Sequence, residues 1–142
     1  MAILKPDEVV VIAGINDLKI GSAAGRGPVQ AATALGEILA IGEAMDIPIT
    51  LLEVWGATEN FTLRGLLLPQ SLPGDILALN SRIIEMGALG SAKTASANAF
   101  LNNENLVRAE LARDTFHLND QGLEILRKLI SESLDATSTD TD

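Results

Sequence analysis

Two short segments of the chain are rich in apolar and β-branched residues. The first, residues 8–13, is bounded by Pro6 and Gly14, and the second, residues 49–55, ends at Gly56. Segments of this length and composition are typical of strands in a parallel sheet. We therefore expect two strands, of which the first is buried on both faces.

Three longer segments carry apolar residues at the spacing of an α-helix instead. They span residues 29–45, 76–86 and 118–134. Pro28 suits the first turn of the first helix, and Asp75 can cap the second. Asn119 or Asp120 is available as the cap of the last. The pattern predicts three amphipathic helices that pack on the sheet.

The order of these segments predicts an α/β fold. A strand, a helix and a second strand in succession imply a right-handed parallel crossover, with helices on the faces of the sheet. We expect residues 57–74 to form a loop over the carboxyl edge of the sheet, and residues 90–105 a loop that contains a weak strand or a short helix. Residues 1–134 should form a single domain, and residues 135–142, mostly Asp, Ser and Thr, a disordered acidic tail.

Charge and composition exclude several classes of partner and site. The 142 residues have a formal net charge of −9 and only 10 Lys and Arg residues, which are scattered. Nucleic acids and anionic membranes require clustered basic residues, so we expect neither as a partner. The sequence has no recognisable signal peptide or transmembrane segment and reads as soluble, which leaves its compartment open. Because cysteine is absent, disulfides and thiolate sites are excluded.

The first candidate motif follows directly on the first predicted strand. It consists of Gly14, Ile15, Asn16 and Asp17. Ligands bind at the carboxyl ends of the strands in open α/β sheets, so the Asn16 amide is placed where it can donate to a developing oxyanion. Since the same residue types favour turns on their own, a plain turn is the alternative interpretation.

The second candidate motif, Asp114-Thr115-Phe116-His117, precedes the last predicted helix. Within a turn, the Asp114 carboxylate can accept a hydrogen bond from one imidazole nitrogen of His117. The other nitrogen is then free to act as a general base. The alternative is an ordinary solvated histidine. We expect no cofactor, and two carboxylates with one histidine, Asp17, Asp114 and His117, are a poor metal-ligand signature at these spacings.

Together the two motifs resemble the SGNH (GDSL-type) hydrolase family. In that family a Gly-x-Asn-Asp block follows the third strand, and an Asp-x-x-His block precedes the C-terminal helix. The resemblance runs from about residue 5 to residue 134 and corresponds to the later two thirds of the family's domain. It implies a partial flavodoxin-like parallel sheet with helices on its faces, without the family's first strand and helix.

The resemblance also implies roles for individual residues. Asn16 would donate to the oxyanion, His117 would be the base and Asp114 would orient the imidazole. Gly14 and Asp17 would support them. The family's nucleophile stands in an opening Gly-Asp-Ser block, and no Gly-Asp-Ser occurs in this sequence.

The absence of that block affects both the site and the sheet. Ser22 lies just past the first motif, but it lacks a strand-to-helix turn that would present its hydroxyl. Without the family's first strand, residues Val9 to Ala13 would form an unpaired apolar edge. We expect this edge to be covered by a second copy in a homo-oligomer, by a complementing chain that supplies the missing segment, or by a local rearrangement.

Two functions are compatible with these observations. One is a carboxylester or acetyl-ester hydrolase that acts on a small ester or an acetylated sugar, with its nucleophile either supplied by another polypeptide or lost from this sequence. The other is a non-catalytic binding or assembly module derived from the same fold. Trp55, Phe61 and residues 63–68 are candidates to line a substrate or partner surface, with ordinary core packing as the alternative.

Overall fold

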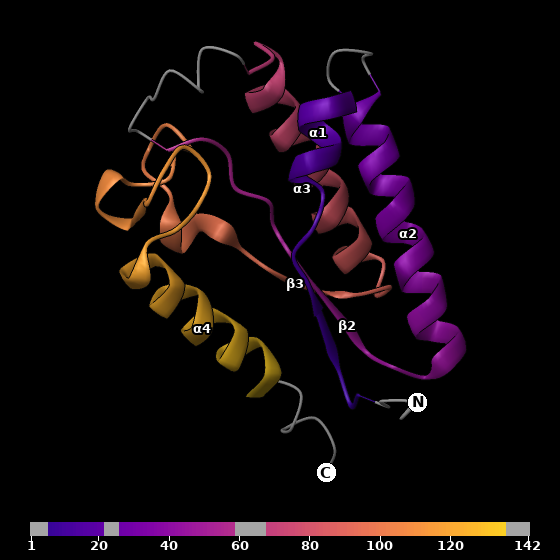
Figure 1. The fold of residues 1–142 in the computed structure, drawn as a ribbon. Coiled ribbons are helices and arrows are strands. Elements are labelled where there is room, and N and C mark those ends of the chain that lie inside the picture. Colours follow the sequence, from indigo (N-terminus) through magenta and orange to yellow (C-terminus); the bar gives the residue numbers. More distant parts are fainter. Residues whose placement is uncertain (1–5, 22–25, 59–67, 136–142) are drawn as a thin grey trace, which may run out of the picture.

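A three-stranded parallel sheet lies at the centre of the molecule (Figure 1). The computed structural model describes residues 6–21, 26–58 and 68–135. The strands are β1 (Val9–Val11), β2 (Ile49–Leu52) and β3 (Lys93–Ala95), in the order β1-β2-β3. Val10 pairs with Thr50, which in turn pairs with Lys93. The predicted parallel α/β architecture is confirmed.

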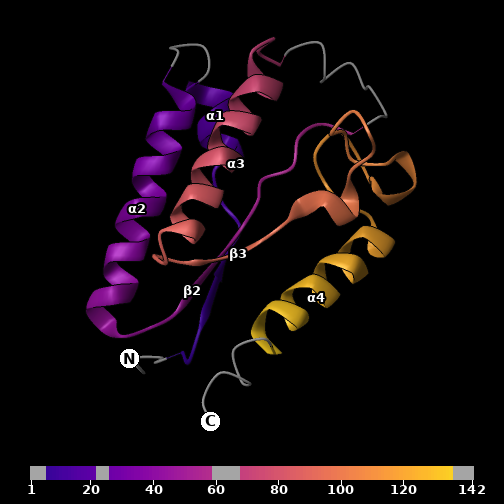
Figure 2. The ribbon, with the colours of Figure 1, turned by 180° about the vertical axis from the view of Figure 1, so that it is seen from behind.

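Helices lie on both faces of the sheet, as Figures 1 and 2 show from opposite sides. One face carries α2 (Gly27–Met45) and α3 (Leu72–Ala88), with the short α1 (Ile15–Gly21) packed against both. The other face carries α4 (Asp120–Asp135). Two 3-10 helices, η3 (Ala97–Phe100) and η4 (Ala109–Leu111), lie between β3 and α4. None of the helices within the described ranges is long and apolar enough to cross a membrane.

Two separate apolar clusters join these layers. The larger cluster lies between the sheet and the layer of α1, α2 and α3, and its fully buried members include Leu18, Ala31, Leu51, Leu79 and Ile83. The smaller cluster connects the two 3-10 helices to α4 through Ala97, Phe100, Val107, Leu111 and Leu118. Each side of the sheet therefore has its own core.

The two strands that the sequence predicted differ in burial. All four residues of β2 are buried, whereas the three residues of β1 are only half-buried. The reason is topological, since β2 has a neighbour on each side and β1 is at one end of the described sheet. The expectation that the first strand is buried on both faces is therefore wrong.

The boundaries of α2 and α3 follow from proline and from backbone conformation. Pro28 lies in the first turn of α2, and the helix ends at Met45, followed by the C-cap Asp46, whose φ of 55° is left-handed. α3 begins at Leu72, earlier than predicted, because Pro73 fits the first helical turn, where its missing N–H costs nothing. Asp75 is then inside the first turn of α3 and is not its cap.

Local structure also forms where the sequence predicted loops. The Gly14 to Asp17 motif, for which a plain turn was the alternative, leads into α1, whose Leu18 is completely buried. β3 and η3 lie within residues 90–105, as expected of that segment. Of the predicted loop 57–74, residues 59–67 lie outside the described residues, as does the predicted tail from residue 136 onward. Asp135, assigned to the tail, is the last residue of α4.

Candidate active site

Gly14 to Asp17 lie at the carboxyl end of β1, where the chain turns into α1. Gly14 has a φ of 117°, and a Cβ atom placed on it would lie 2.7 Å from Cδ2 of Leu79. Both facts require glycine at this position. The Gly14 carbonyl accepts from the Leu18 N–H at 3.0 Å, which starts the helix. Asn16 and Asp17 lie in the first turn of α1, and both are exposed.

Asp114 and His117 face each other across a tight turn. Nδ1 of His117 lies 2.8 Å from Oδ1 and 2.9 Å from Oδ2 of Asp114. Oδ1 also accepts from the backbone N–H groups of Phe116, at 3.0 Å, and of His117, at 3.1 Å. These hydrogen bonds, led by the one from Phe116, lower the pKa of Asp114 to about 2. An ionised Asp114 favours the imidazole tautomer with its proton on Nδ1, which leaves Nε2 available.

The turn is anchored to the segment that follows β2. The Thr58 N–H donates to the carbonyl of Thr115 at 3.0 Å, and Thr115 is almost completely buried. Nε1 of Trp55 donates to the carbonyl of Phe116 at 3.3 Å. The backbone of the Asp114 to His117 turn is thus fixed by two hydrogen bonds that begin near the carboxyl end of the central strand.

A cation–π contact joins the same turn to α1. Nζ of Lys19 lies 3.7 Å from the centroid of the Phe116 ring. Lys19 is one helical turn after Asn16, and Phe116 immediately precedes His117. The contact therefore links the helix that carries the candidate oxyanion donor to the turn that carries the candidate base.

These elements enclose a cavity of about 200 Å³. Its walls are formed by the ends of β1 and β2, by α1 and by the Asp114 to His117 turn, and its lining residues are Ile12, Ala13, Ile15, Asn16, Lys19, Val54, Trp55, Phe116 and His117. Asn16 and His117, which are about a hundred positions apart in the sequence, meet at this cavity. The structure does not bring Asp17 into the lining.

The cavity offers a hydrogen-bond donor and a base, but its lining contains no hydroxyl or thiol group from the described part of the chain. An amide N–H can stabilise negative charge on a carbonyl oxygen, and an imidazole backed by a carboxylate can accept a proton. Ser22 lies outside the described residues. In residues 6–21, 26–58 and 68–135, no three His, Asp or Glu side chains gather as a potential metal site.

Several residues of the site escaped the sequence analysis. Lys19 belongs to no motif, and the role of the Phe116 ring within the second motif depends on its contact with Lys19 of a distant segment. Asn80, which lies within the predicted helix 76–86, forms hydrogen bonds through its side chain with both the N–H and the carbonyl of Val54, each at 2.8 Å. A polar residue in an otherwise apolar helix stripe was the available signal. Trp55 lines the cavity, whereas Phe61 and residues 63–67 lie outside the described residues.

Comparison with known proteins places the fold. No protein-family model matches the sequence, and no curated protein is similar to it in sequence. Among solved structures, the chain is similar to a GDSL-like lipase from Bacteroides thetaiotaomicron VPI-5482, with 20% sequence identity and a TM-score of 0.76. It is also similar to an acetyl xylan esterase, with 20% identity and a TM-score of 0.66.

These similarities cover most of this chain but only part of the other structures. The match with the lipase covers 93% of this chain and 63% of the lipase, and the match with the esterase covers 90% and 67%. The chain therefore spans about two thirds of the length of the structures that it resembles. Its fold is the SGNH (GDSL-type) fold, present as a partial flavodoxin-like parallel sheet.

Proposed function

We propose that this chain carries the oxyanion donor and the general base of an ester hydrolase, and that a serine from outside the described residues completes the site. The observation that carries the proposal is the meeting of Asn16 with the Asp114–His117 pair at one cavity. The similarity in fold to a lipase and an acetyl xylan esterase supports this choice of chemistry.

Each group has a defined part in the reaction. The serine Oγ bonds to the ester carbonyl carbon while its proton passes to Nε2 of His117. Asn16 donates to the oxygen that becomes negative. Asp114 stays anionic, keeps the proton on Nδ1 and stabilises the imidazolium. The carbon–oxygen bond to the alcohol then breaks, and the alcohol leaves with the proton from Nε2. Water releases the acyl group by the same steps, which restores the serine.

The cavity favours small substrates. A volume of about 200 Å³, with Trp55 and Phe116 among its walls, suits a short acyl group better than a long aliphatic chain. We propose a carboxylester or acetyl ester, such as an acetylated sugar, as the substrate class. The polar rim formed by Asn16, Lys19 and His117 can bond to the oxygen atoms of a sugar.

The proposal is tested by supplying the serine. We define the serine segment as a designed peptide with an apolar strand, a Gly-Asp-Ser turn and an amphipathic helix, joined by a flexible linker to the N-terminus of the chain. The fused protein should hydrolyse a nitrophenyl acetate ester. His117→Ala should lower kcat/KM by about 10²- to 10⁴-fold, and Asn16→Ala by about 10²- to 10³-fold.

Asn103→Ala is the matched control, because Asn103 is an exposed loop asparagine that does not line the cavity. It should leave kcat/KM unchanged. If the fused protein shows no turnover that depends on His117, although its fold is intact, the enzyme hypothesis is wrong for this chain.

The second candidate function is a binding or assembly module. The observation that favours it is the cavity lining, which contains no hydroxyl or thiol side chain from the residues that the structure describes. A module of this kind should bind a small ester or acetylated sugar with an affinity that Trp55→Ala weakens, and it should leave the ester intact even with the serine segment present.

A further inference from the structure

Beyond the end of β2, the backbone of the central strand is bonded to a helix instead of to a neighbouring strand. The pairing of β2 with β1 extends to Leu51, and its pairing with β3 extends to Leu52. Val54 lies two residues further on and is only 4% exposed, so its N–H and carbonyl groups need partners within the protein. The next residue, Trp55, lines the candidate active site. The partners of Val54 therefore influence where Trp55 lies.

Asn80 of α3 supplies both partners. Its Oδ1 accepts a hydrogen bond from the Val54 N–H, and its Nδ2 donates to the Val54 carbonyl, each at 2.8 Å. A side-chain amide carries an acceptor and a donor side by side, so it replaces the two bonds that a neighbouring strand would make. An apolar side chain at this position would leave both backbone groups of Val54 without these bonds.

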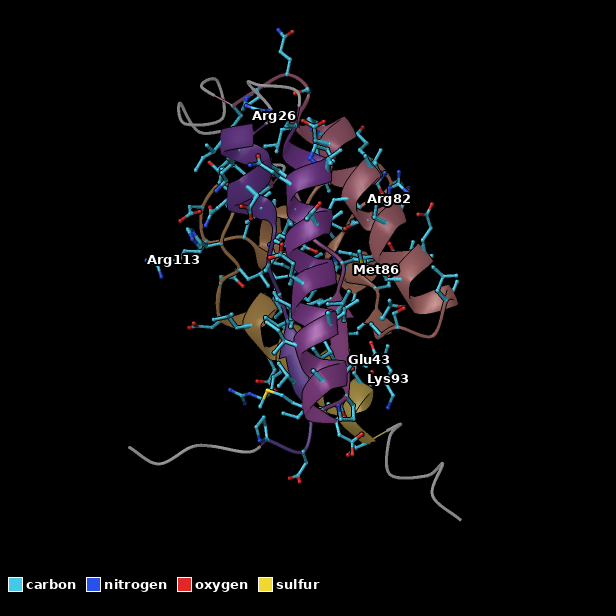
Figure 3. The ribbon with its side chains drawn as sticks, turned by 90° about the vertical axis from the view of Figure 1, so that its right-hand side faces the viewer. Arg26, Glu43, Arg82, Met86, Lys93 and Arg113 are labelled. Carbon is cyan, nitrogen blue, oxygen red and sulfur yellow. The ribbon has the colours of Figure 1, made fainter. Side chains whose placement is uncertain are left out.

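The place of Asn80 on α3 agrees with this arrangement. Arg82 lies on the outer side of α3 (Figure 3), where it pairs with Glu85, and its side chain is 64% exposed. Two residues along an α-helix are separated by about 200° around its axis. Asn80 therefore points away from Arg82, toward the sheet, and it is half-buried.

Leu79, in the same turn of α3, packs against the first motif. Its side chain is completely buried, and its Cδ2 lies 2.7 Å from the place where a Cβ atom on Gly14 would be. Gly14 begins the turn that leads to Asn16, and Val54 begins the segment that leads to Trp55. One turn of α3 therefore touches the chain just before a site residue in each of these two segments.

Trp55 connects Val54 to the turn that carries the histidine. Its Nε1 donates to the carbonyl of Phe116 at 3.3 Å, and Phe116 immediately precedes His117. The contacts thus run from α3 through one backbone residue and one indole ring to the residue next to the candidate base. Asn80 itself does not line the cavity, so it can act on the base only through these contacts.

We infer that Asn80 is a positioning residue for the candidate base. Its side-chain amide holds the backbone of Val54, and the hydrogen bond from Trp55 carries this position to the His117 turn. The inference rests on the proposed function for the chemical role of His117. The displacement of the histidine ring that it predicts can be measured in the chain alone, without catalysis.

The first variant removes both bonds with little change in side-chain size. Asn80→Leu should shift the NMR signals of the Trp55 indole N–H and of the His117 ring, because the backbone next to Trp55 is no longer held. Ile83→Ala is the matched control, since Ile83 is 1% exposed in the larger core and lies on the same helix. It weakens the packing of α3 and should leave both signals in place.

Two outcomes of this comparison would overturn the inference. One is a folded Asn80→Leu protein with unshifted Trp55 and His117 signals. The other is a shift of equal size in Ile83→Ala, which would mean that any loss of packing on α3 moves the base and that the amide has no special part.

The second variant, Asn80→Asp, decides the matter if the leucine variant does not fold. An uncharged carboxyl group can accept from the Val54 N–H and donate to the Val54 carbonyl, whereas an ionised one can only accept. The Trp55 and His117 signals should match those of the wild-type protein while the introduced group is protonated. They should depart from them as it ionises, at or above about pH 4. A difference from the wild-type protein that is zero, or constant at every pH, would contradict the inference.

Activity in the fused protein gives an independent measurement. Asn80→Leu should lower kcat by up to about 10²-fold with little change in KM, because a displaced base slows the chemical step and leaves the cavity able to bind substrate. An unchanged kcat would overturn the inference. If the fused protein with Asn80 intact shows no turnover that depends on His117, the proposed function fails, and the NMR signals of the chain alone still decide whether Asn80 positions the histidine.

Discussion

The two sides of the sheet are built in different ways. On one side, long helices with regular apolar spacing pack on the sheet, and the core of Leu35, Leu51 and Leu79 is continuous. On the other side, α4 and two 3-10 helices surround a small cluster around Phe100, and loops connect them. The candidate site lies between the two, with Asn16 on the helical side and His117 on the loop side. The helical side positions Asn16 at the site, and the loop side supplies His117.

The largest effect should come from the small cluster. Phe100 is fully buried and its ring lies 5.3 Å from that of Trp55, the only tryptophan of the chain. Phe100→Ala should lower the free energy of unfolding by about 3–5 kcal/mol, because it leaves a cavity that loops cannot fill. Urea unfolding measures this loss, and Trp55 fluorescence should change in the folded state.

Leu35→Ala is the matched control on the other side, since Leu35 is 3% exposed and belongs to the larger core. It should cost about 2–5 kcal/mol in unfolding free energy and leave the Trp55 emission of the folded protein unaltered. If both variants changed the emission equally, the two sides would not be separate packing units.

A second substitution acts where the two sides meet. Gly14→Ala forces an alanine into a φ of 117° and places its Cβ 2.7 Å from Leu79. Strain of this kind costs about 1–3 kcal/mol, and the clash adds to it. Urea unfolding should show the loss. Gly36→Ala should be neutral or stabilising, because Gly36 is inside α2 with open space around it.

A third experiment tests the charge in the turn. The pKa of Asp114 is lowered to about 2 from an ordinary value near 4, so its contribution to stability is present above pH 4 and is lost as the pH falls toward 2. Because the side chain is 43% exposed, solvent screening limits this contribution to under about 1 kcal/mol.

Asp114→Asn should therefore remove part of the loss of stability that the wild-type protein shows between pH 5 and pH 2. Urea unfolding at both pH values measures the difference. Glu104→Gln is the control, since Glu104 is an exposed loop carboxylate outside this turn. An identical pH dependence for Asp114→Asn and the wild-type protein would show that the turn does not hold the carboxylate in its charged form.

The sequence predicted the helical side well because that side depends on local patterns. Apolar spacing located α2 and α3, and the position of Pro28 indicated where α2 begins. The sequence did not predict α1, because glycines on both sides of this short segment disfavour a helix. The burial of Leu18 stabilises the helix instead. β3 has a polar edge, Lys93 and Thr94, and so lacks the apolar run of a typical strand.

The site shows the same division. The hydrogen bond between Asp114 and His117 spans three residues, so its spacing could be read from the sequence. The groups that hold the turn in place, Thr58 and Trp55, act across more than fifty residues, and no local pattern predicts such contacts. The meeting of Asn16 with His117 required both the parallel order of the strands and these long-range hydrogen bonds.

The smallest predicted effect concerns the direct link between the two sides. The Lys19 ammonium lies over the Phe116 ring at 3.7 Å, and an exposed contact of this type is worth about 0.5–1 kcal/mol. Lys19→Met keeps the length of the side chain and removes the charge, so the unfolding free energy should fall by that amount. The ring signals of His117, the only histidine, should shift in the NMR spectrum. Lys128→Met, on the exposed face of α4, should alter neither. Unshifted His117 signals in Lys19→Met would mean that the hydrogen bonds from Thr58 and Trp55 position the turn without help from Lys19. The cation–π contact would then have no influence on the His117 ring.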